Sequence, residues 1–157
     1  MPVPGQFAPD ITLPRGDGTP VTLSHLRPSA VVLFFYSENG SETCTLEACA
    51  FSDATPDFAA AGARLVGISR DPVVSHDKFS RKHGLQMPLL SDETGTACTA
   101  YGVWQPKKLF GRSYMGVIRS TFLVDGAGRV ARVWPAVRLK GHVAEVLAAV
   151  SALPSAS

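Results

Sequence analysis

Seven consecutive apolar residues at positions 30–36 (AVVLFFY) constrain the fold more than any other segment of this chain. A strand with one face in water would alternate apolar and polar residues, whereas this run is apolar on both faces. A strand of that kind lies in the middle of a sheet that is covered on both sides. The run therefore predicts a layered α/β protein built around a central sheet.

The flanking segments predict how this sheet is completed. Residues 10–26 hold two short alternating runs around Gly16-Asp17-Gly18, which predict an N-terminal β-hairpin. Further strands are predicted at 64–69, 87–92 and on both sides of the turn at 125–128, and helices at 55–62, 71–84, 94–102 and 141–153. This order of elements predicts a mixed central sheet flanked by helices on both faces.

The helix boundaries carry more specific expectations. Thr55 is predicted to cap the helix at 55–62, with Gly62 as its stop. Asp71 is predicted to cap the helix at 71–84, with Val74 and Phe79 on its inner side.

Length and composition favour one globular domain over residues 1–157, with 154–157 as a frayed tail. A formal net charge of +2 with scattered basic residues gives no reason to expect nucleic-acid binding. The first residues lack the basic and apolar regions of a signal peptide, and no apolar stretch approaches the roughly 18 residues of a membrane span. These features predict a cytoplasmic protein without a membrane partner.

Three cysteines are too few, and odd in number, for a secreted disulfide framework, so reactive or buried thiols are expected. Cys44 lies in the segment 38–49 (ENGSETCTLEAC), just after the central strand and where a helix is predicted to begin. Ser41 or Thr43 can cap that helix. The helix dipole and the free backbone N–H groups stabilise a thiolate there and lower its pKa from about 8.5, which makes Cys44 a candidate nucleophile.

Cys49 follows Cys44 by five residues. On an ideal helix this spacing gives a rise of about 7.5 Å, a rotation of about 140° and a Cα separation of roughly 8.7 Å. That exceeds the ~7 Å limit for an unstrained disulfide, so the two thiols can bond only if the helix unwinds. The spacing indicates either a conformational redox cycle or two unrelated thiols, and it is not the C-x-x-C of a thioredoxin.

Several segments in order resemble one family: FFYSENGSETCTLEAC, SHDKFSRKHGLQMPLLSD, AYGVW, and GRSYMGVIRSTFLVDGAGRVARVW followed by KGHVAEVL. Over roughly residues 3–153 the chain resembles the peroxiredoxin Q branch of the peroxiredoxins, also called bacterioferritin comigratory protein. The resemblance implies a thioredoxin-like fold and thiol-dependent reduction of hydrogen peroxide and organic hydroperoxides, without a metal or organic cofactor. It also implies an external reductant such as thioredoxin, and a monomer.

The same resemblance assigns roles to individual residues. Cys44 matches the peroxidatic cysteine, which forms a sulfenic acid, and Cys49 the resolving cysteine, which forms an intramolecular disulfide with it. Arg119 matches the arginine that lowers the thiol pKa and orients the peroxide. Ser41 stands where a threonine hydrogen-bonds the peroxide, and Glu47 matches a glutamate that holds Arg119.

The chain also departs from the family pattern. Ser37 replaces a proline that shields the pocket, which predicts a looser, wetter site, and Thr43 replaces a common glycine beside the thiol. Both belong to the candidate substrate-binding set. Some members carry the resolving cysteine in a later helix, where this chain has Ser80. Cys98 is expected to be a core residue, with a competing resolving thiol as the alternative.

Two other functional classes stay open at this level. The same cysteines suit a peroxide-responsive redox sensor or a thiol-regulated interaction module with little turnover. A general disulfide oxidoreductase is weaker because C-x-x-C is absent. The four histidines lack metal-ligand spacing and are expected at the surface or at helix ends: His25, His76, His83 and His142.

Overall fold

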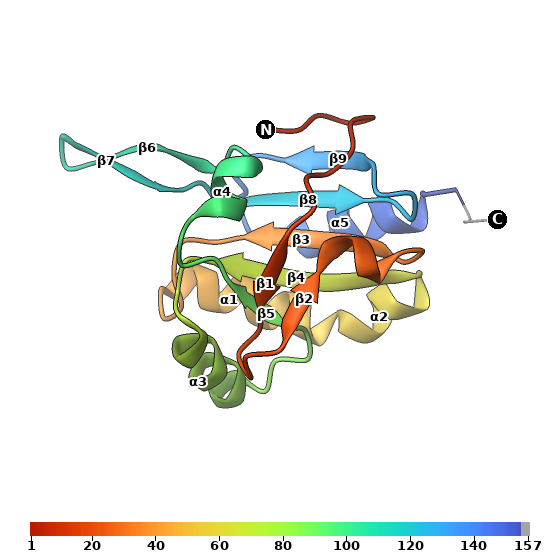
Figure 1. Cartoon of the computed structure of the whole chain (residues 1–157), viewed down its shortest axis with the longest axis horizontal. Helices are drawn as coiled ribbons and strands as arrows, with labels where there is room; N and C mark the ends of the chain where they lie inside the picture. The colour runs from red at the N-terminus through yellow and green to blue at the C-terminus, as the bar shows by residue number, and fades with distance from the viewer. Residues whose placement is uncertain (155–157) are drawn as a thin grey trace.

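A five-stranded mixed sheet forms the centre of the computed structural model, which describes residues 1–154 (Figure 1). Its strands lie in the order β5-β4-β3-β8-β9. Their bounds are β3 Ala30–Phe35, β4 Ala63–Ser69, β5 Leu89–Ser91, β8 Ser120–Val124 and β9 Val130–Trp134. Every residue of β3 is buried, and β3 pairs in parallel with β4 and antiparallel with β8. The predicted central strand is thus confirmed, while the predicted tail lies, from residue 155 onward, outside the described residues.

Four helices pack on one face of this sheet or along its β5 edge: α1 Glu42–Asp53, α2 Thr55–Ala60, α3 Val73–His83 and α5 His142–Ser151 (Figure 1). Their inner side chains form a core with the sheet. Phe51 of α1 stacks on Phe34 of β3 with ring centroids 4.6 Å apart, and Phe58, Phe79 and Val146 belong to the same buried cluster. Helix α1 is therefore held to the sheet by its third turn.

The opposite face is covered by the N-terminal segment and by one short helix. The segment contains the predicted hairpin, β1 Thr12–Pro14 paired with β2 Pro20–Thr22, and the 3₁₀ turn η1 Leu23–Leu26. Helix α4 spans Thr96–Ala100. Just after it, the buried Tyr101 donates a hydrogen bond from its hydroxyl to the carbonyl of Pro9 (2.6 Å). The expectation of helices on both faces is confirmed.

A second hairpin, absent from the sequence prediction, follows α4. Strands β6 Trp104–Leu109 and β7 Arg112–Val117 form a separate two-stranded sheet that projects from the body of the molecule (Figure 1). Its turn is Phe110-Gly111, whereas Asn-Gly and Asp-Gly are the usual signals for two-residue hairpin turns. Pro106 also lowers the strand signal of this segment, because proline has no backbone N–H to donate to a neighbouring strand. The hairpin therefore carried no turn or strand signal that the sequence prediction could use.

The predicted cap of α2 is wrong. Ala54 occupies the N-cap position with helical backbone angles (φ −88°, ψ −1°), so α2 follows α1 almost without a break. An N-cap side chain needs an extended backbone, which is not available here. Thr55 instead lies inside the helix and donates a hydrogen bond to the carbonyl of Phe51 (3.2 Å). Gly62 does follow the helix with a positive φ of 86°, as predicted.

The predicted start of α3 is also displaced. Pro72 is the N-cap, and the Asp71 carboxylate accepts a hydrogen bond from the backbone N–H of Asn39 (2.9 Å) instead of capping the helix. Phe79 is buried as predicted, but Val74 is 63% exposed. Five residues turn an α-helix by about 140°, so Val74 and Phe79 could not share one face.

Two of the four histidines are buried: His76, contrary to the prediction, and His142, which does lie at a helix end as the first residue of α5. His76 lies among Tyr36, Asn39 and Ser69, and His142 shares a 2.8 Å hydrogen bond with Thr121. Burial lowers the pKa of both rings, which favours the neutral form. Among residues 1–154, no group of three or more acidic, His or Cys side chains is placed to hold a metal ion, and no helix has the length and apolar character to cross a bilayer.

Candidate active site

Helix α1 begins in the loop that leaves the carboxyl end of β3. Ser41 is its N-cap, with extended backbone angles, and the Ser41 hydroxyl accepts a hydrogen bond from the backbone N–H of Cys44 (3.2 Å). Cys44 is therefore the third residue of the helix and lies in its first turn. A side chain at this position meets free N–H groups and the positive end of the helix dipole.

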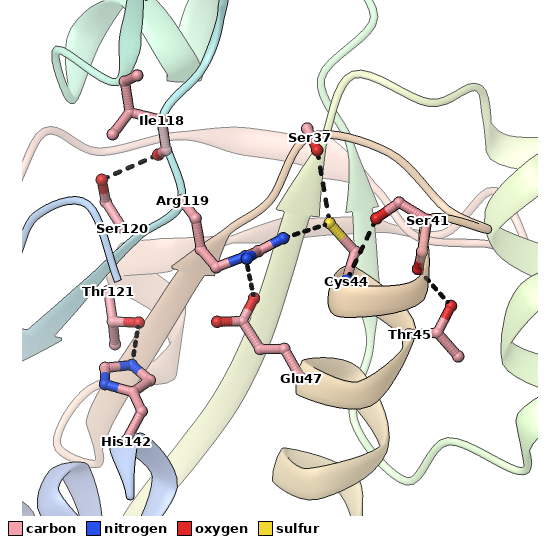
Figure 2. A network of polar contacts seen from close by, with 10 residues as sticks. All are labelled: Ser37, Ser41, Cys44, Thr45, Glu47, Ile118, Arg119, Ser120, Thr121 and His142. Atoms are coloured by element: carbon pink, nitrogen blue, oxygen red, sulfur yellow. Dashed lines mark hydrogen bonds and ion pairs between the residues drawn. The ribbon is translucent and has the colours of Figure 1, made fainter. Parts of the chain in front are cut away.

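Two side chains from outside the helix contact the Cys44 sulfur (Figure 2). Arg119 donates a hydrogen bond from Nη2 to Sγ at 3.0 Å, and the Ser37 hydroxyl lies 3.5 Å from the same atom. Strand pairing explains why they meet. Phe35 of β3 pairs with Ser120 of β8, so Ser37 and Arg119 lie just beyond this pair at one edge of the sheet.

These contacts decide the ionisation of Cys44, whose side chain is almost wholly buried. Burial opposes ionisation of the thiol. Hydrogen bonds from Ser37, Ser41, the backbone N–H of Glu38 and Arg119 outweigh it, and the pKa of Cys44 falls to about 7. About half of the thiol is then ionised at neutral pH, as a nucleophile requires.

Glu47 lies one helical turn after Cys44 and is fully buried. Its Oε1 is 3.7 Å from Nε of Arg119, and among the described residues neither carboxylate oxygen has a hydrogen-bond partner (Figure 2). Burial raises the pKa of Glu47 to about 8, and the guanidinium opposes this only in part. Arg119 is thus shared by two acidic groups, which must titrate as a coupled pair.

An open pocket of about 400 Å³ is lined in part by Ser37 and Glu38. Arg70 stacks over the ring of Trp104 at 4.4 Å in its wall, and Lys107 enters the pocket from β6. Burial and the nearby Arg119 lower the pKa of Lys107, while Cys44 and Glu38 act in the opposite direction. Ser37, whose hydroxyl lies 3.5 Å from the Cys44 sulfur, is the lining residue that connects this pocket to the thiol.

The other two cysteines lie in different surroundings. Cys49 is half-buried in the unbroken helix α1, and burial, with Asp53 nearby, raises its pKa. Cys98 is fully buried in α4, on the opposite face of the sheet from Cys44, and burial together with Asp92 raises its pKa. This agrees with the expectation that Cys98 is a core residue. All three cysteines are free thiols.

The structure brings together four of the residues singled out from the sequence, namely Ser37, Cys44, Glu47 and Arg119, with Ser41 as the cap below them. Thr43 does not join them, because it is exposed on the outer side of the first turn. Cys44 beside Ser37 is 1% exposed, and a site looser and wetter than one with proline at this position stays a prediction. The small serine side chain turns toward the sulfur and fills the space beside it with a hydroxyl group.

Sequence reasoning missed Asn39, which holds the loop before Cys44. Its backbone N–H and its side-chain amide donate hydrogen bonds to Asp71 (2.9 Å) and to Ser75 (3.0 Å). The Tyr36 hydroxyl donates to its Oδ1 at 2.7 Å. An asparagine in a loop between a strand and a helix is a common turn residue, which is why it gave no separate signal.

Removal of the Ser37 hydroxyl should raise the pKa of Cys44. In Ser37→Ala the thiolate loses one hydrogen bond, so the charged form is less stable and the titration midpoint moves up by about one pH unit. The ultraviolet absorbance of the thiolate measures this midpoint in a Cys49→Ser, Cys98→Ala background. Ser113→Ala, which changes an exposed serine of β7, is the matched control and should leave the midpoint unchanged. An unchanged midpoint in Ser37→Ala would show that the hydroxyl does not stabilise the thiolate.

Comparisons with known proteins agree with one another. Residues 4–133 match the model of the AhpC/TSA family. Peroxiredoxin Bcp of Bacillus subtilis is 43% identical over 143 residues, covering 91% of this chain and 91% of the relative. Peroxiredoxin Bcp of Escherichia coli is 34% identical over 138 residues, covering 88% of each.

Solved structures give the same picture. The bacterioferritin comigratory protein of Xanthomonas campestris, described with an alkyl peroxide reduction activity, superposes with a TM-score of 0.86 at 38% identity and covers 90% of each chain. Peroxidoxin BcpB of Mycobacterium tuberculosis superposes with a TM-score of 0.87 at 38% identity, covering 99% of this chain and all of the other.

Proposed function

The chain belongs to the AhpC/TSA family, as one of its peroxiredoxins of the Bcp type, and from this premise we propose that Cys44 is the residue that attacks the peroxide. The family makes the protein a thiol-dependent peroxidase with a peroxide substrate and a thiol reductant. The observation that supports Cys44 is the 3.0 Å hydrogen bond from Arg119 to its sulfur at the first turn of a helix.

In the proposed reaction the Cys44 thiolate displaces an alkoxide or hydroxide from the peroxide. A bond forms between sulfur and the terminal oxygen while the O–O bond breaks, and the leaving oxygen takes up a proton to give an alcohol or water. The sulfur is oxidised to a sulfenic acid and the peroxide is reduced. Negative charge moves from sulfur to the oxygens as this happens.

Arg119 is the residue best placed to stabilise that charge. Its guanidinium touches the sulfur through Nη2, and Glu47 lies near Nε on its other side. A planar guanidinium offers several N–H donors in a fixed fork, so it can contact the sulfur and a peroxide oxygen at once and follow the charge from one to the other. Ser37 adds a hydroxyl from the pocket side, and Ser41 supports the helix start.

Cys49 is the proposed resolving thiol. It condenses with the sulfenic acid, forming an S–S bond and releasing water, and an external dithiol then reduces the disulfide by two electrons. The unbroken helix separates the two thiols, so its first two turns must unwind. Of the larger apolar residues of these turns, Leu46 is 54% exposed, while the stacked Phe51 lies in the third turn. The apolar side chains that unwinding would newly expose, Cys44 and Ala48, are small.

A disulfide between Cys44 and Cys49 should appear after treatment with one equivalent of hydrogen peroxide. Peptide mass spectrometry should find the linked pair in the wild type and in Cys98→Ser, and lose it in both Cys44→Ser and Cys49→Ser. In Cys49→Ser, Cys44 should accumulate as sulfenic acid. A Cys44–Cys98 link, or sulfenic acid that persists in the wild type, would rule out Cys49 as the resolving thiol.

Several finer properties belong to the same proposal. The activity described for the Xanthomonas protein supports organic hydroperoxides as substrates beside hydrogen peroxide. A thioredoxin is the proposed dithiol reductant, because it exchanges with exposed disulfides of this kind. We also propose one domain over residues 1–157, acting as a monomer because the disulfide lies within one chain. A cytoplasmic location stays a prediction.

A further inference from the structure

The β6–β7 hairpin, residues 104–117, carries side chains that neither the fold nor the proposed reaction explains. It forms its own two-stranded sheet and projects from the body, away from the helices (Figure 1). At its tip Phe110 is 95% exposed and Leu109 is 55% exposed. Tyr114 and Met115, closer to the body, are about half exposed. Apolar side chains thus gather on a projecting element.

The turn itself is unfavourable for the residue that occupies it. Phe110 has a φ of 50° and Gly111 a φ of 75°, the pattern of a type I′ turn. This region is strained for a bulky residue, and asparagine or glycine adopts it more readily. Phe110 therefore adopts a strained backbone conformation although its side chain is not buried. This indicates that the side chain has a role other than stabilising the hairpin.

The charges around the tip have one sign. The β6–β7 hairpin carries three cations, Lys107, Lys108 and Arg112, and residues 94–124 contain no aspartate or glutamate. Strand pairing sets Leu109 opposite Arg112 and Lys108 opposite Ser113, so two of these cations directly flank the exposed apolar tip. An apolar tip between cations is complementary to a surface that is negatively charged outside and apolar beneath.

We propose that the tip of the β6–β7 hairpin inserts into the surface of an anionic lipid bilayer. Leu109 and Phe110 would enter the boundary between headgroups and acyl chains, and Lys108 and Arg112 would contact the anionic headgroups. This docking does not depend on the peroxidase reaction. It would bring the pocket at the base of the hairpin, lined by Trp104, Lys107 and Ser37, close to the membrane surface.

The small size of the β6–β7 hairpin tip favours a bilayer over a protein partner. A stable protein interface buries about 800 Å² on each partner, more than a single two-stranded turn offers. Pairing of two identical tips would bring their cations together without an acidic residue to neutralise them. A bilayer needs only a few inserted apolar side chains and nearby cations.

The test is co-sedimentation of the full chain with vesicles at physiological salt. The wild type should bind vesicles of equal parts phosphatidylglycerol and phosphatidylcholine, and should bind phosphatidylcholine vesicles at least tenfold more weakly. Phe110→Asn should weaken binding to the anionic vesicles about tenfold or more, because the inserted ring is lost. Lys108→Gln with Arg112→Gln should weaken it roughly 25-fold.

Asparagine suits the backbone angles of position 110, so the first variant should keep or raise the thermal stability and leave peroxidase activity in solution unchanged. Val74→Asn, which removes a similarly exposed apolar side chain from α3, is the matched control and should bind like the wild type.

Three results would overturn the proposal: equal binding of the wild type to neutral and anionic vesicles, no binding to either, or equal loss in Val74→Asn and Phe110→Asn. Sedimentation velocity without lipid adds a fourth. A dimer of the wild type that is lost in Phe110→Asn would identify the tip as a contact between copies of this chain.

Discussion

Replacement of Arg119 by methionine should lower kcat/KM for hydrogen peroxide by about 100- to 1,000-fold at pH 7. Two effects combine. The thiolate loses the hydrogen bond that Nη2 makes to its sulfur at 3.0 Å, so less of Cys44 is ionised. The charge that moves onto the peroxide oxygens also loses its donor. Burial raises the pKa of Glu47 to about 8 even with Arg119 beside it, so most of this carboxyl group is already protonated at pH 7 and loss of the cation should leave little unpaired charge there.

The pH dependence separates these two effects. The thiolate fraction rises with pH, so repeating the measurement at pH 9 should restore about tenfold of the activity of Arg119→Met and leave the remaining loss. Arg119→Lys keeps the charge without the planar fork and should fall between the wild type and the methionine variant. Complete recovery of Arg119→Met at pH 9 would mean that Arg119 acts on ionisation alone.

Replacement of Cys44 by serine should reduce peroxide consumption to the rate of the buffer. A serine hydroxyl is not ionised near neutral pH and does not accept oxygen from a peroxide, so the first step is lost. Serine is close in size to cysteine and can keep the hydrogen bonds to Ser37 and Arg119, so the fold should survive. Consumption of peroxide by a coupled thioredoxin assay measures the effect, and circular dichroism checks the fold.

The matched variant for this experiment is Cys98→Ala. It removes a buried thiol from the opposite face of the sheet and should retain nearly all of the activity, with a modest loss of thermal stability from the small cavity. If Cys44→Ser keeps residual turnover, and this turnover disappears when Cys98 is also replaced, then Cys98 reacts with the peroxide and our assignment of Cys44 is wrong.

The elements that sequence predicted well are those specified by local pattern. The run at 30–36 is apolar on both faces, so it can be buried only in the middle of a covered sheet. Ser41 lies three residues before Cys44, the spacing at which an N-cap hydroxyl accepts a hydrogen bond from the backbone N–H. Arg119 is different. It lies 75 residues from Cys44, and only the pairing of β3 with β8 brings it to the sulfur. Its role could be predicted only from the family resemblance, because a local sequence pattern cannot show that two residues so far apart in the chain meet in space.

The failures have physical causes as well. For Ser37, which replaces a proline, the sequence analysis did not foresee that the small hydroxyl side chain turns inward and lies 3.5 Å from the sulfur. The burial of His76 was missed because nothing near it in the sequence shows the hydrogen-bond partners that the fold supplies. The β6–β7 hairpin escaped because its turn breaks the residue preferences on which prediction depends.

The placement of the three cysteines on two sides of the sheet has a consequence for disulfide chemistry. Thiols exchange partners only when their sulfurs meet, and the sheet, with the side chains packed on its two faces, separates Cys98 from the other two cysteines. While the sheet is intact, an oxidised Cys44 can therefore reach only one thiol of its own chain. Under the proposed function, repeated oxidation and reduction should then not scramble the pairing, because the topology, and not a difference in reactivity, selects the intramolecular partner of Cys44.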